Sequence, residues 1–177
     1  VYTGGVRKAV ENHMMDTGPQ FLPPQWAFRP WRWRDDHTQR EEYFDGSEVT
    51  APYNSELVED VLMCQALDIP LGVYWVDRPW GAGPWGYDEL EWDRERLPQP
   101  EKMIRWLDQK KIKFMLWICP WTKGPVMEKT ADEKGWIVPR TMDCIDFSNP
   151  EARTWWQQNY LKKLLEDGVA GFKLDRA

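Results

Sequence analysis

The chain has 177 residues, enough for one compact domain with a hydrophobic core, and 13 of them are tryptophan. Its formal net charge of −6 argues against binding to a nucleic-acid backbone, because neutralising phosphates requires clustered lysine and arginine. No run of 18 or more apolar residues occurs, so the sequence predicts no membrane-spanning segment. These features predict a tryptophan-rich globular protein that has neither a nucleic acid nor a lipid bilayer as its partner.

Cysteine and histidine are sparse. The three cysteines, Cys64, Cys119 and Cys144, are widely spaced, which fits neither a CxxC metal pair nor a closed set of disulfides and indicates unpaired thiols. His13 and His37 are the only histidines, too few for a histidine-based metal centre. We therefore expect no metal ion and no cofactor.

Residues 1–24 are expected to form a lead-in segment from a missing N-terminal region. Residues 6–15 are compatible with a short helix, after which Gly18 and Pro19 break regular structure. Residues 25–177 are expected to form the folded domain.

Apolar runs and helical patterns alternate along this domain, which predicts βα units and a parallel sheet. The expected strands are residues 26–33, 71–76, 113–119 and 169–174. The expected helices begin at Asn54 or Ser55, at Pro100 and after Ser148, and end near Ile69, Gln109 and Gly168. Long irregular connections at 34–50 and 120–147 are of the length that is usually functional.

Four strands with three connecting helices predict the first half of a (β/α)8 TIM barrel, truncated after its fourth strand. An open flavodoxin-like sheet is the alternative. The first strand is not followed by a glycine-rich phosphate loop, which argues against a nucleotide-binding sheet.

The last predicted helix has the strongest start signal. Ser148 and Asn149 offer capping side chains, Pro150 suits the first turn, and Glu151 is favourable near a helix N-terminus. Helical spacing then predicts a buried stripe of Trp155, Trp156, Tyr160, Leu161, Leu164 and Leu165.

Two aspartates directly follow apolar runs, Asp77 after residues 71–76 and Asp175 after residues 169–174. In a parallel barrel the carboxyl ends of the strands meet at one mouth, so both side chains are expected to face it. Glycoside cleavage uses two carboxyl groups, about 5 Å apart in retaining enzymes and further apart in inverting ones. An aspartate after a strand also caps helices, so the pattern alone leaves catalysis and capping open.

Tryptophans gather at or just beyond the predicted strand ends. Their flat apolar faces suit stacking on sugar rings, and an apolar floor with a few convergent acids is typical of a small-ligand pocket. Core packing is the alternative, and it is favoured for Trp106, Trp155 and Trp156, which match buried helical stripes. Both interpretations stay open for Trp31, Trp33, Trp75, Trp80, Trp85, Trp117 and Trp121.

Five short segments follow one another along the chain: PPQWA (23–27), LGVYWVD (71–77), LWICPW (116–121), DFSNP (146–150) and GFKLD (171–175). In this order they resemble the barrel strands, and the helix start before the nucleophile strand, of glycoside hydrolase family 31. That is a family of retaining α-glycosidases. The resemblance covers most of the chain.

The resemblance implies that Asp175 attacks the anomeric carbon and forms a glycosyl-enzyme ester, which water hydrolyses with net retention. It implies that Asp77 binds ring hydroxyls, that Trp117 lines the glycone subsite, and that Asp146 supports the site or contacts the sugar at its edge. Further candidate substrate-binding residues are Trp80, Trp121, Lys173 and Arg176; for Arg176 a surface ion pair is the alternative.

The chain also departs from the family's pattern. Asp77 is followed by Arg78 rather than by the Ile-Asp-Tyr common in glucosidases, which leaves α-galactosidase, α-xylosidase and α-glucosidase activity open. The family's acid/base residue lies on a later strand and has no counterpart here. Residues 25–177 are therefore expected to be the N-terminal half of a glycosidase barrel, inactive alone. Its expected partners are an oligosaccharide or α-glycoside substrate, the rest of the barrel and an N-terminal β-sandwich.

Two other classes of function stay open. A noncatalytic carbohydrate-binding fragment would use the same tryptophans without needing Asp175. An assembly or interaction segment would use the exposed sheet edges of a half barrel and would self-associate without binding sugar. Within the enzyme class, a transferase or lyase would share the nucleophile with a hydrolase.

Overall fold

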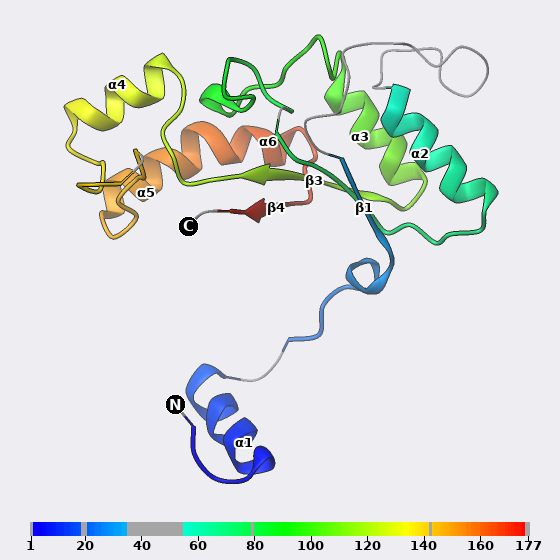
Figure 1. Ribbon diagram of the computed structural model, residues 1–177, viewed down its shortest axis with the longest axis horizontal. Helices are drawn as coiled ribbons and strands as arrows, with labels where there is room; N and C mark the ends of the chain where they lie inside the picture. The colour runs from blue at the N-terminus through cyan, green and yellow to red at the C-terminus, as the bar shows by residue number, and fades with distance from the viewer. Residues whose placement is uncertain (1, 19–20, 35–54, 79, 142, 176–177) are drawn as a thin grey trace.

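The structure, a computed structural model, describes residues 2–18, 21–34, 55–78, 80–141 and 143–175. Its centre is a parallel sheet in the order β1-β2-β3-β4, so neighbours along the chain are neighbours in the sheet (Figure 1). The strands are β1 (Trp31–Arg34), β2 (Val73–Val76), β3 (Lys113–Ile118) and β4 (Gly171–Leu174). This arrangement is that of the first half of a (β/α)8 barrel, as predicted.

Helices connect the strands as expected of βα units. They are α2 (Ser55–Ala66) before β2, α3 (Pro100–Gln109) before β3, and a continuous segment before β4 formed by α5 (Pro150–Trp156), the π-helical turn η3 (Gln157–Leu161) and α6 (Lys162–Glu166). The side chain of Asn149 accepts hydrogen bonds from the backbone N–H groups of Glu151 and Ala152. The predicted cap of the last helix is therefore confirmed.

The first strand is shorter than predicted. A 3-10 helix, η1 (Gln25–Phe28), occupies its expected start, and the backbone N–H of Arg29 closes this turn on the carbonyl of Trp26 at 3.2 Å. Proline at position 30 has no backbone N–H to donate to a sheet, and β1 begins directly after it.

The connection between β3 and α5 was predicted as a loop, but it contains helix α4 (Pro125–Glu133). Only Met127 and Ala131 of its nine residues are buried, so its apolar pattern is weak. In the next helical segment Leu165 is 51 % exposed rather than part of the buried stripe. Local periodicity predicted neither helix α4 nor the exposure of Leu165, because both depend on tertiary packing.

The two faces of the sheet differ. Side chains alternate between faces along a strand, and one set packs against the helices in the main hydrophobic core: Tyr74, Val76, Phe114, Leu116 and Ile118. Val73 and Met115 belong to the alternate set, and although buried they lie outside that core. Trp117, at the end of β3, belongs to the alternate set but is part of the core, and Trp75 packs against that core. The alternate set lies on the face that a barrel directs to its interior.

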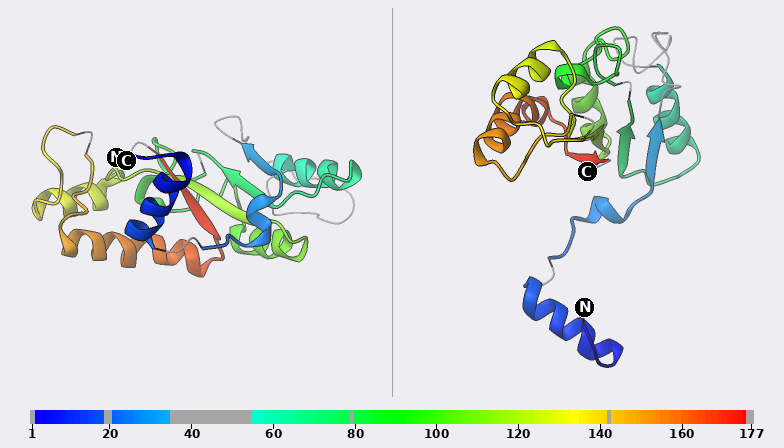
Figure 2. Two further views of the ribbon diagram at one scale, coloured as in Figure 1. Left: turned by 90° about the horizontal axis from the view of Figure 1, so that it is seen from below. Right: turned by 60° about the vertical axis from the view of Figure 1, so that its left-hand side comes forward.

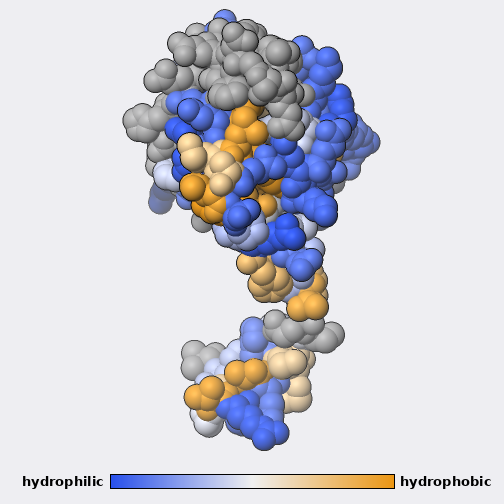
Figure 3. All heavy atoms as spheres, turned by 90° about the vertical axis from the view of Figure 1, so that its right-hand side faces the viewer, coloured by the Kyte–Doolittle hydropathy of each residue, from blue (hydrophilic) through white to orange (hydrophobic). Residues whose placement is uncertain are grey.

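Helix α1 (Val6–Thr17) lies apart from the sheet and its helices (Figures 1 and 2). None of its residues is buried, and apolar side chains are visible on its surface and on the segment that leads to the sheet (Figure 3). The division of the chain at residue 24 stays a prediction. None of the helices among the described residues has the length and apolar composition needed to cross a membrane.

Candidate functional site

Asp77 and Asp175 lie at the carboxyl ends of β2 and β4, at the same edge of the sheet. Backbone hydrogen bonds hold both in register: the N–H of Asp77 donates to the carbonyl of Arg34 at 2.7 Å, and the N–H of Asp175 donates to the carbonyl of Ile118 at 2.9 Å. This is the edge at which barrel enzymes build their active sites.

The strand register identifies which side chains share a face with these two acids. Trp33 pairs with Trp75, and Trp117 pairs with Lys173. Because side chains two residues apart point to the same face, the face opposite the helices carries Trp33, Trp75, Asp77, Trp117, Lys173 and Asp175. We call these six residues the carboxylate–indole cluster.

The carboxylate of Asp175 is oriented by two neighbours. Trp117 donates from Nε1 to Oδ2 at 3.0 Å, and the ammonium group of Lys173 donates to the same oxygen at 2.7 Å. The Asp175 side chain nevertheless remains 40 % exposed. It is therefore both fixed in direction and reachable by a ligand, which is what a carboxylate nucleophile requires.

Asp77 is electrostatically coupled to the same group. Burial raises the pKa of Asp77 above its usual 3.8, and the negative charge of Asp175 adds to the increase. Three interactions oppose it: the hydrogen bond from the backbone N–H of Arg78 at 2.9 Å, the charge of Lys173 and a hydrogen bond from the side chain of Trp33. The two acids and Lys173 therefore form one electrostatic unit.

Lys173 lies between the acids and the indole rings. Its Nζ atom is 5.6 Å from the ring centroid of Trp75 and 5.9 Å from that of Trp117, within cation–π range. The rings of Trp33 and Trp75 lie 5.7 Å apart at an interplanar angle of 30°. The cluster thus combines an apolar aromatic wall with two acids and one cation, a composition typical of small-ligand sites.

Sequence reasoning left Trp33 and Trp75 undecided between packing and stacking, and neither was among the predicted site residues. A usable signal existed for Trp75, which precedes Asp77 by two residues just as Lys173 precedes Asp175. Trp33 could be assigned only from the register between β1 and β2. Trp31, at the start of β1, is 47 % exposed.

Trp80 and Trp117 are buried deeply. The indole of Trp80 is fully enclosed, stacks edge-on against Trp92 at 5.4 Å and donates from Nε1 to the backbone carbonyl of Trp117 at 2.7 Å. Trp80 was predicted to contact substrate, but its ring has no open face here. Trp117 is 4 % exposed and reaches the site through its N–H group.

The other predicted binding residues lie in or beyond the loops. The backbone of Trp121 pairs with that of Cys144 in an antiparallel bridge within the connection between β3 and α5. The carboxylate of Asp146 accepts hydrogen bonds from the backbone N–H and the hydroxyl of Ser148, so it shapes the entry into α5. Arg176 lies outside the described residues.

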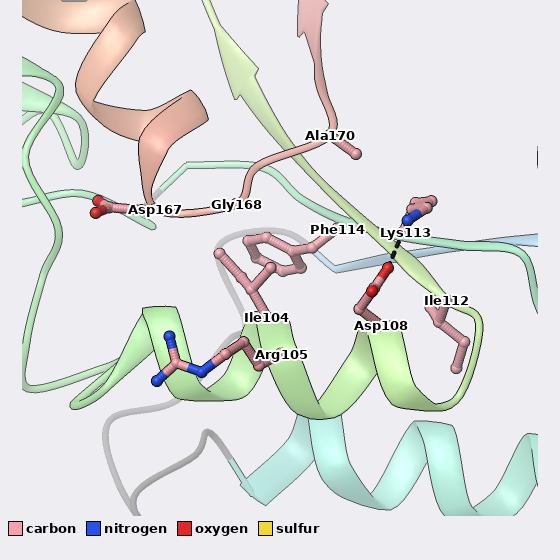
Figure 4. Close-up of a pocket in the computed structure, with 9 residues that line it drawn as sticks. All are labelled: Ile104, Arg105, Asp108, Ile112, Lys113, Phe114, Asp167, Gly168 and Ala170. Carbon is pink, nitrogen blue, oxygen red and sulfur yellow. Dashed lines mark hydrogen bonds and ion pairs between the residues drawn. The ribbon is translucent and has the colours of Figure 1, made fainter.

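No group of three or more His, Cys, Asp or Glu side chains among the described residues is placed to hold a metal ion. A cavity of about 340 Å³ lies at the opposite end of the strands, beside the start of β3 and the turn before β4 (Figure 4). Lys113 is ion-paired with Asp108 there, and Ile104 and Phe114 form an apolar wall. That end of a barrel ordinarily serves stability rather than catalysis.

The comparisons with known proteins agree with this geometry. Alpha-xylosidase XylQ of Lactiplantibacillus pentosus is 30 % identical over 195 residues, covering 99 % of this chain and 23 % of that protein. Neutral alpha-glucosidase AB of Homo sapiens is 26 % identical over 160 residues, covering 79 % of this chain and 15 % of that protein. The family 31 dextranase of Flavobacterium johnsoniae, solved with glucose, superposes with a TM-score of 0.75 at 23 % identity, covering 95 % of this chain and 21 % of that one.

The chain thus covers only 15–23 % of the length of these three proteins. The sequence model of the family described as "Glycosyl hydrolases family 31 TIM-barrel domain" matches residues 20–177. The TM-score of 0.75 with the dextranase shows that the similarity extends to the fold. The chain therefore belongs to glycosyl hydrolase family 31.

Proposed function

We propose that this chain supplies the nucleophile half of a retaining α-glycosidase site. The observation that carries the proposal is the carboxylate of Asp175, which is oriented by Trp117 and Lys173 at the end of β4 while 40 % of its side chain stays exposed. Membership of a glycosidase family supports glycoside hydrolysis as the reaction class.

In this mechanism an oxygen of Asp175 attacks the anomeric carbon as the bond to the leaving oxygen breaks, and an ester joins sugar and enzyme. Water then cleaves the ester, which releases the sugar with net retention. The ammonium group of Lys173 and the N–H of Trp117 hold the Asp175 carboxylate in a fixed direction before attack. The leaving oxygen takes its proton from an acid/base residue, which we propose to lie in the rest of the barrel.

The other members of the cluster bind the sugar. Asp77 accepts hydrogen bonds from ring hydroxyls when it is ionised, and the walls formed by Trp33 and Trp75 pack against the apolar faces of the ring. Trp80 helps to fix the position of Trp117, because its Nε1–H donates to the backbone carbonyl of Trp117. Trp121, Asp146 and Arg176 remain candidates for contacts at the edge of the site.

The substrate is proposed to be an α-linked xyloside or glucoside, because one similar protein is an alpha-xylosidase and another an alpha-glucosidase. The whole active site is proposed to need the rest of the barrel, so the chain alone is expected to be inactive. The alternative, a noncatalytic carbohydrate-binding fragment, would bind the same sugars without forming an ester.

Covalent trapping tests the proposal in the whole protein that carries this chain. A panel of 5-fluoro glycosyl fluorides with xylo, gluco and galacto configuration is incubated with the protein, followed by intact-mass analysis and peptide mapping. We expect a single glycosyl label on Asp175, absent in Asp175→Asn and retained in the matched control Asp108→Asn, whose carboxylate lies at the far end of the sheet. Saccharide binding without any label would support the binding fragment instead.

A further inference from the structure

The loops that follow β2 and β3 are joined by one side chain that has no part in the mechanism above. Helix α4 lies in the connection after β3, and its N-cap residue is Gly124, which has no side chain with which to bond the first N–H groups of the helix. Glu89 lies in the short 3-10 helix η2 (Asp88–Leu90), in the connection after β2.

The carboxylate of Glu89 supplies the missing cap of α4. Its Oε1 accepts hydrogen bonds from the backbone N–H groups of Val126 at 2.7 Å and Met127 at 3.1 Å, and its Oε2 accepts from Met127 at 3.1 Å. The backbone N–H of Glu89 also donates to the carbonyl of Lys123 at 2.8 Å. One residue therefore holds the start of α4 through both its main chain and its side chain, where a negative charge also complements the helix dipole.

The local sequence is adapted to this contact. Glu89 has φ 53° and ψ 13°, a left-handed conformation that is costly for a residue with a side chain. Gly124 has φ 105°, and a Cβ atom there would lie 2.4 Å from Oε1 of Glu89. The positive φ favours glycine at position 124, and a side chain there would have to displace the carboxylate of Glu89.

A third element meets the same carboxylate. Tyr160 lies in the π-helical turn between α5 and α6, and its hydroxyl donates to Oε2 of Glu89 at 3.4 Å. π-helical turns widen a helix locally and are frequent at functional sites. Glu89 therefore connects the loop after β2, the loop after β3 and the helix that leads into the nucleophile strand.

Contacts continue from Glu89 toward the carboxylate–indole cluster. Tyr87, two residues earlier, packs edge-on against Trp117 at 5.1 Å and accepts a hydrogen bond from the thiol of Cys119 at 3.3 Å. Lys123, whose carbonyl is bonded to Glu89, is buried, paired with Asp143 at 2.8 Å and placed 4.6 Å from the ring centroid of Trp85. The contact of Tyr87 leads to Trp117, and the hydrogen bond to Lys123 leads to the loop that carries Trp121; both tryptophans were predicted to bind sugar.

We propose that Glu89 is a positioning residue of the sugar-binding site, which holds the loops after β2 and β3 in one fixed arrangement by capping α4 from the neighbouring loop. This inference rests on the proposed glycosidase function. Glu89 acts on substrate binding through the segment that carries Trp121 and Lys123, whereas Asp175 keeps the hydrogen bond from Lys173 and its backbone N–H still donates to the carbonyl of Ile118. Loss of Glu89 therefore raises KM and leaves kcat nearly unchanged.

The test compares Glu89→Ala and Glu89→Gln with Glu91→Ala in the whole protein that carries this chain. Glu91 is the matched control because its carboxylate lies on the same loop in an exposed ion pair with Lys163 at 3.3 Å. Glu89→Gln keeps one oxygen that accepts N–H bonds, so it tests the cap without emptying the position. Amide hydrogen exchange at Val126 and Met127 is measured together with KM and kcat for the glycoside that the protein hydrolyses.

We expect Glu89→Ala to accelerate exchange at Val126 and Met127 about tenfold and to raise KM by a similar factor, since a helix cap contributes on the order of 1 kcal/mol. Glu89→Gln should lie between the wild type and Glu89→Ala, and Glu91→Ala should match the wild type. Unchanged exchange in Glu89→Ala overturns the cap, and faster exchange with an unchanged KM overturns the positioning role. Absence of glycosidase activity in the wild type overturns the proposed function and the positioning role with it, while exchange still decides the cap.

Discussion

The two faces of the sheet each place a carboxylate beside basic groups, but to different ends. On the face that meets the helices, Asp60 of α2 accepts hydrogen bonds from Arg32, Arg34 and Tyr74, and its side chain is 16 % exposed. On the opposite face Asp175 is held by Lys173 and Trp117 and is 40 % exposed. The first arrangement encloses its charge, whereas the second leaves the charge accessible.

The pKa values of the acids reflect this difference. Burial by itself raises the pKa of Asp60, but the hydrogen bonds from Arg34, Arg32 and Tyr74 outweigh it and lower the pKa below 3.8. For Asp77 the balance is reversed, because burial outweighs its hydrogen bonds and the charge of Lys173, and its pKa is raised. The carboxylate of Asp60 has enough hydrogen-bond donors to stabilise its charge within the fold. The carboxylate of Asp77 has fewer donors and remains available to a ligand.

The largest effect is expected from Asp175→Asn. The amide is nearly isosteric and can keep the hydrogen bond from Trp117, but it is no nucleophile, so kcat should fall by about 10⁴-fold or more. Steady-state kinetics of the whole protein measure this, with thermal unfolding to verify that the variant is folded. Activity within tenfold of the wild type would show that Asp175 is not the nucleophile. The proposed difference in role between Asp175 and Asp60 would then be wrong.

The second-largest effect is expected from Lys173, the cation on the face of the sheet opposite the helices. Lys173→Met keeps an unbranched side chain that is one atom shorter and removes the charge, and we expect kcat/KM to fall about 10²-fold. Because Lys173 lowers the pKa of Asp77, its removal raises that pKa further. If Asp77 must be ionised, the acidic limb of the pH profile of kcat/KM then moves to higher pH. A drop in kcat/KM with no movement of that limb would indicate that Lys173 acts on Asp175 alone.

The third prediction concerns Asp60, on the face of the sheet that meets the helices. Asp60→Asn removes the carboxylate that Arg32 and Arg34 share and leaves Arg34 with its longer ion pair to Glu56. The free energy of unfolding at neutral pH should therefore fall by about 2 kcal/mol. Urea unfolding measures this, while kcat per folded molecule should stay at the wild-type value. A large loss of kcat with unchanged stability would reverse the roles given to the two faces.

The same variant has a defined pH dependence. The pKa of Asp60 is lower in the folded state than its ordinary value, so its contribution to stability is fully present above that value and is lost as pH falls through the folded pKa. The stability difference between the wild type and Asp60→Asn should therefore shrink below about pH 4. A constant difference down to pH 2 would show that charge is not its origin.

The smallest effect is expected at the amino-terminal end of the strands. Lys113→Met removes an exposed ion pair with Asp108 beside the cavity shown in Figure 4. Such pairs contribute about 0–1 kcal/mol, so stability and activity should both remain close to those of the wild type. A marked change in KM would indicate that this cavity, too, binds ligand.

Much of the fold could be predicted because its signals are local. The alternation of apolar runs with helical patterns predicted four parallel strands, and Asp77 and Asp175 were placed at strand ends by their position after those runs. The helix start at Ser148 and Asn149 was predicted because capping depends only on neighbouring residues, and the structure assigns the cap to Asn149. Local prediction was wrong for the start of β1, where a 3-10 turn precedes Pro30.

The structure also changed how individual tryptophans are interpreted. Trp80 and Trp75 both lie near the end of β2 in the sequence, yet Trp80 is fully buried and Trp75 lies under the ammonium group of Lys173. Composition cannot separate them, because burial depends on which distant segments cover each ring. The pairing of Trp33 with Trp75 likewise requires two strands that are about forty residues apart.

By itself the sequence determined the order of strands and helices and the two acids that end β2 and β4, because hydrophobic periodicity and capping act over a few residues. Tertiary structure alone decided that Lys173 and three indoles surround those acids, that Asp60 gathers two arginines on the other face, and that Glu89 caps α4. These contacts join residues far apart in the chain, and their energies depend on geometry that only the packed sheet and its loops establish.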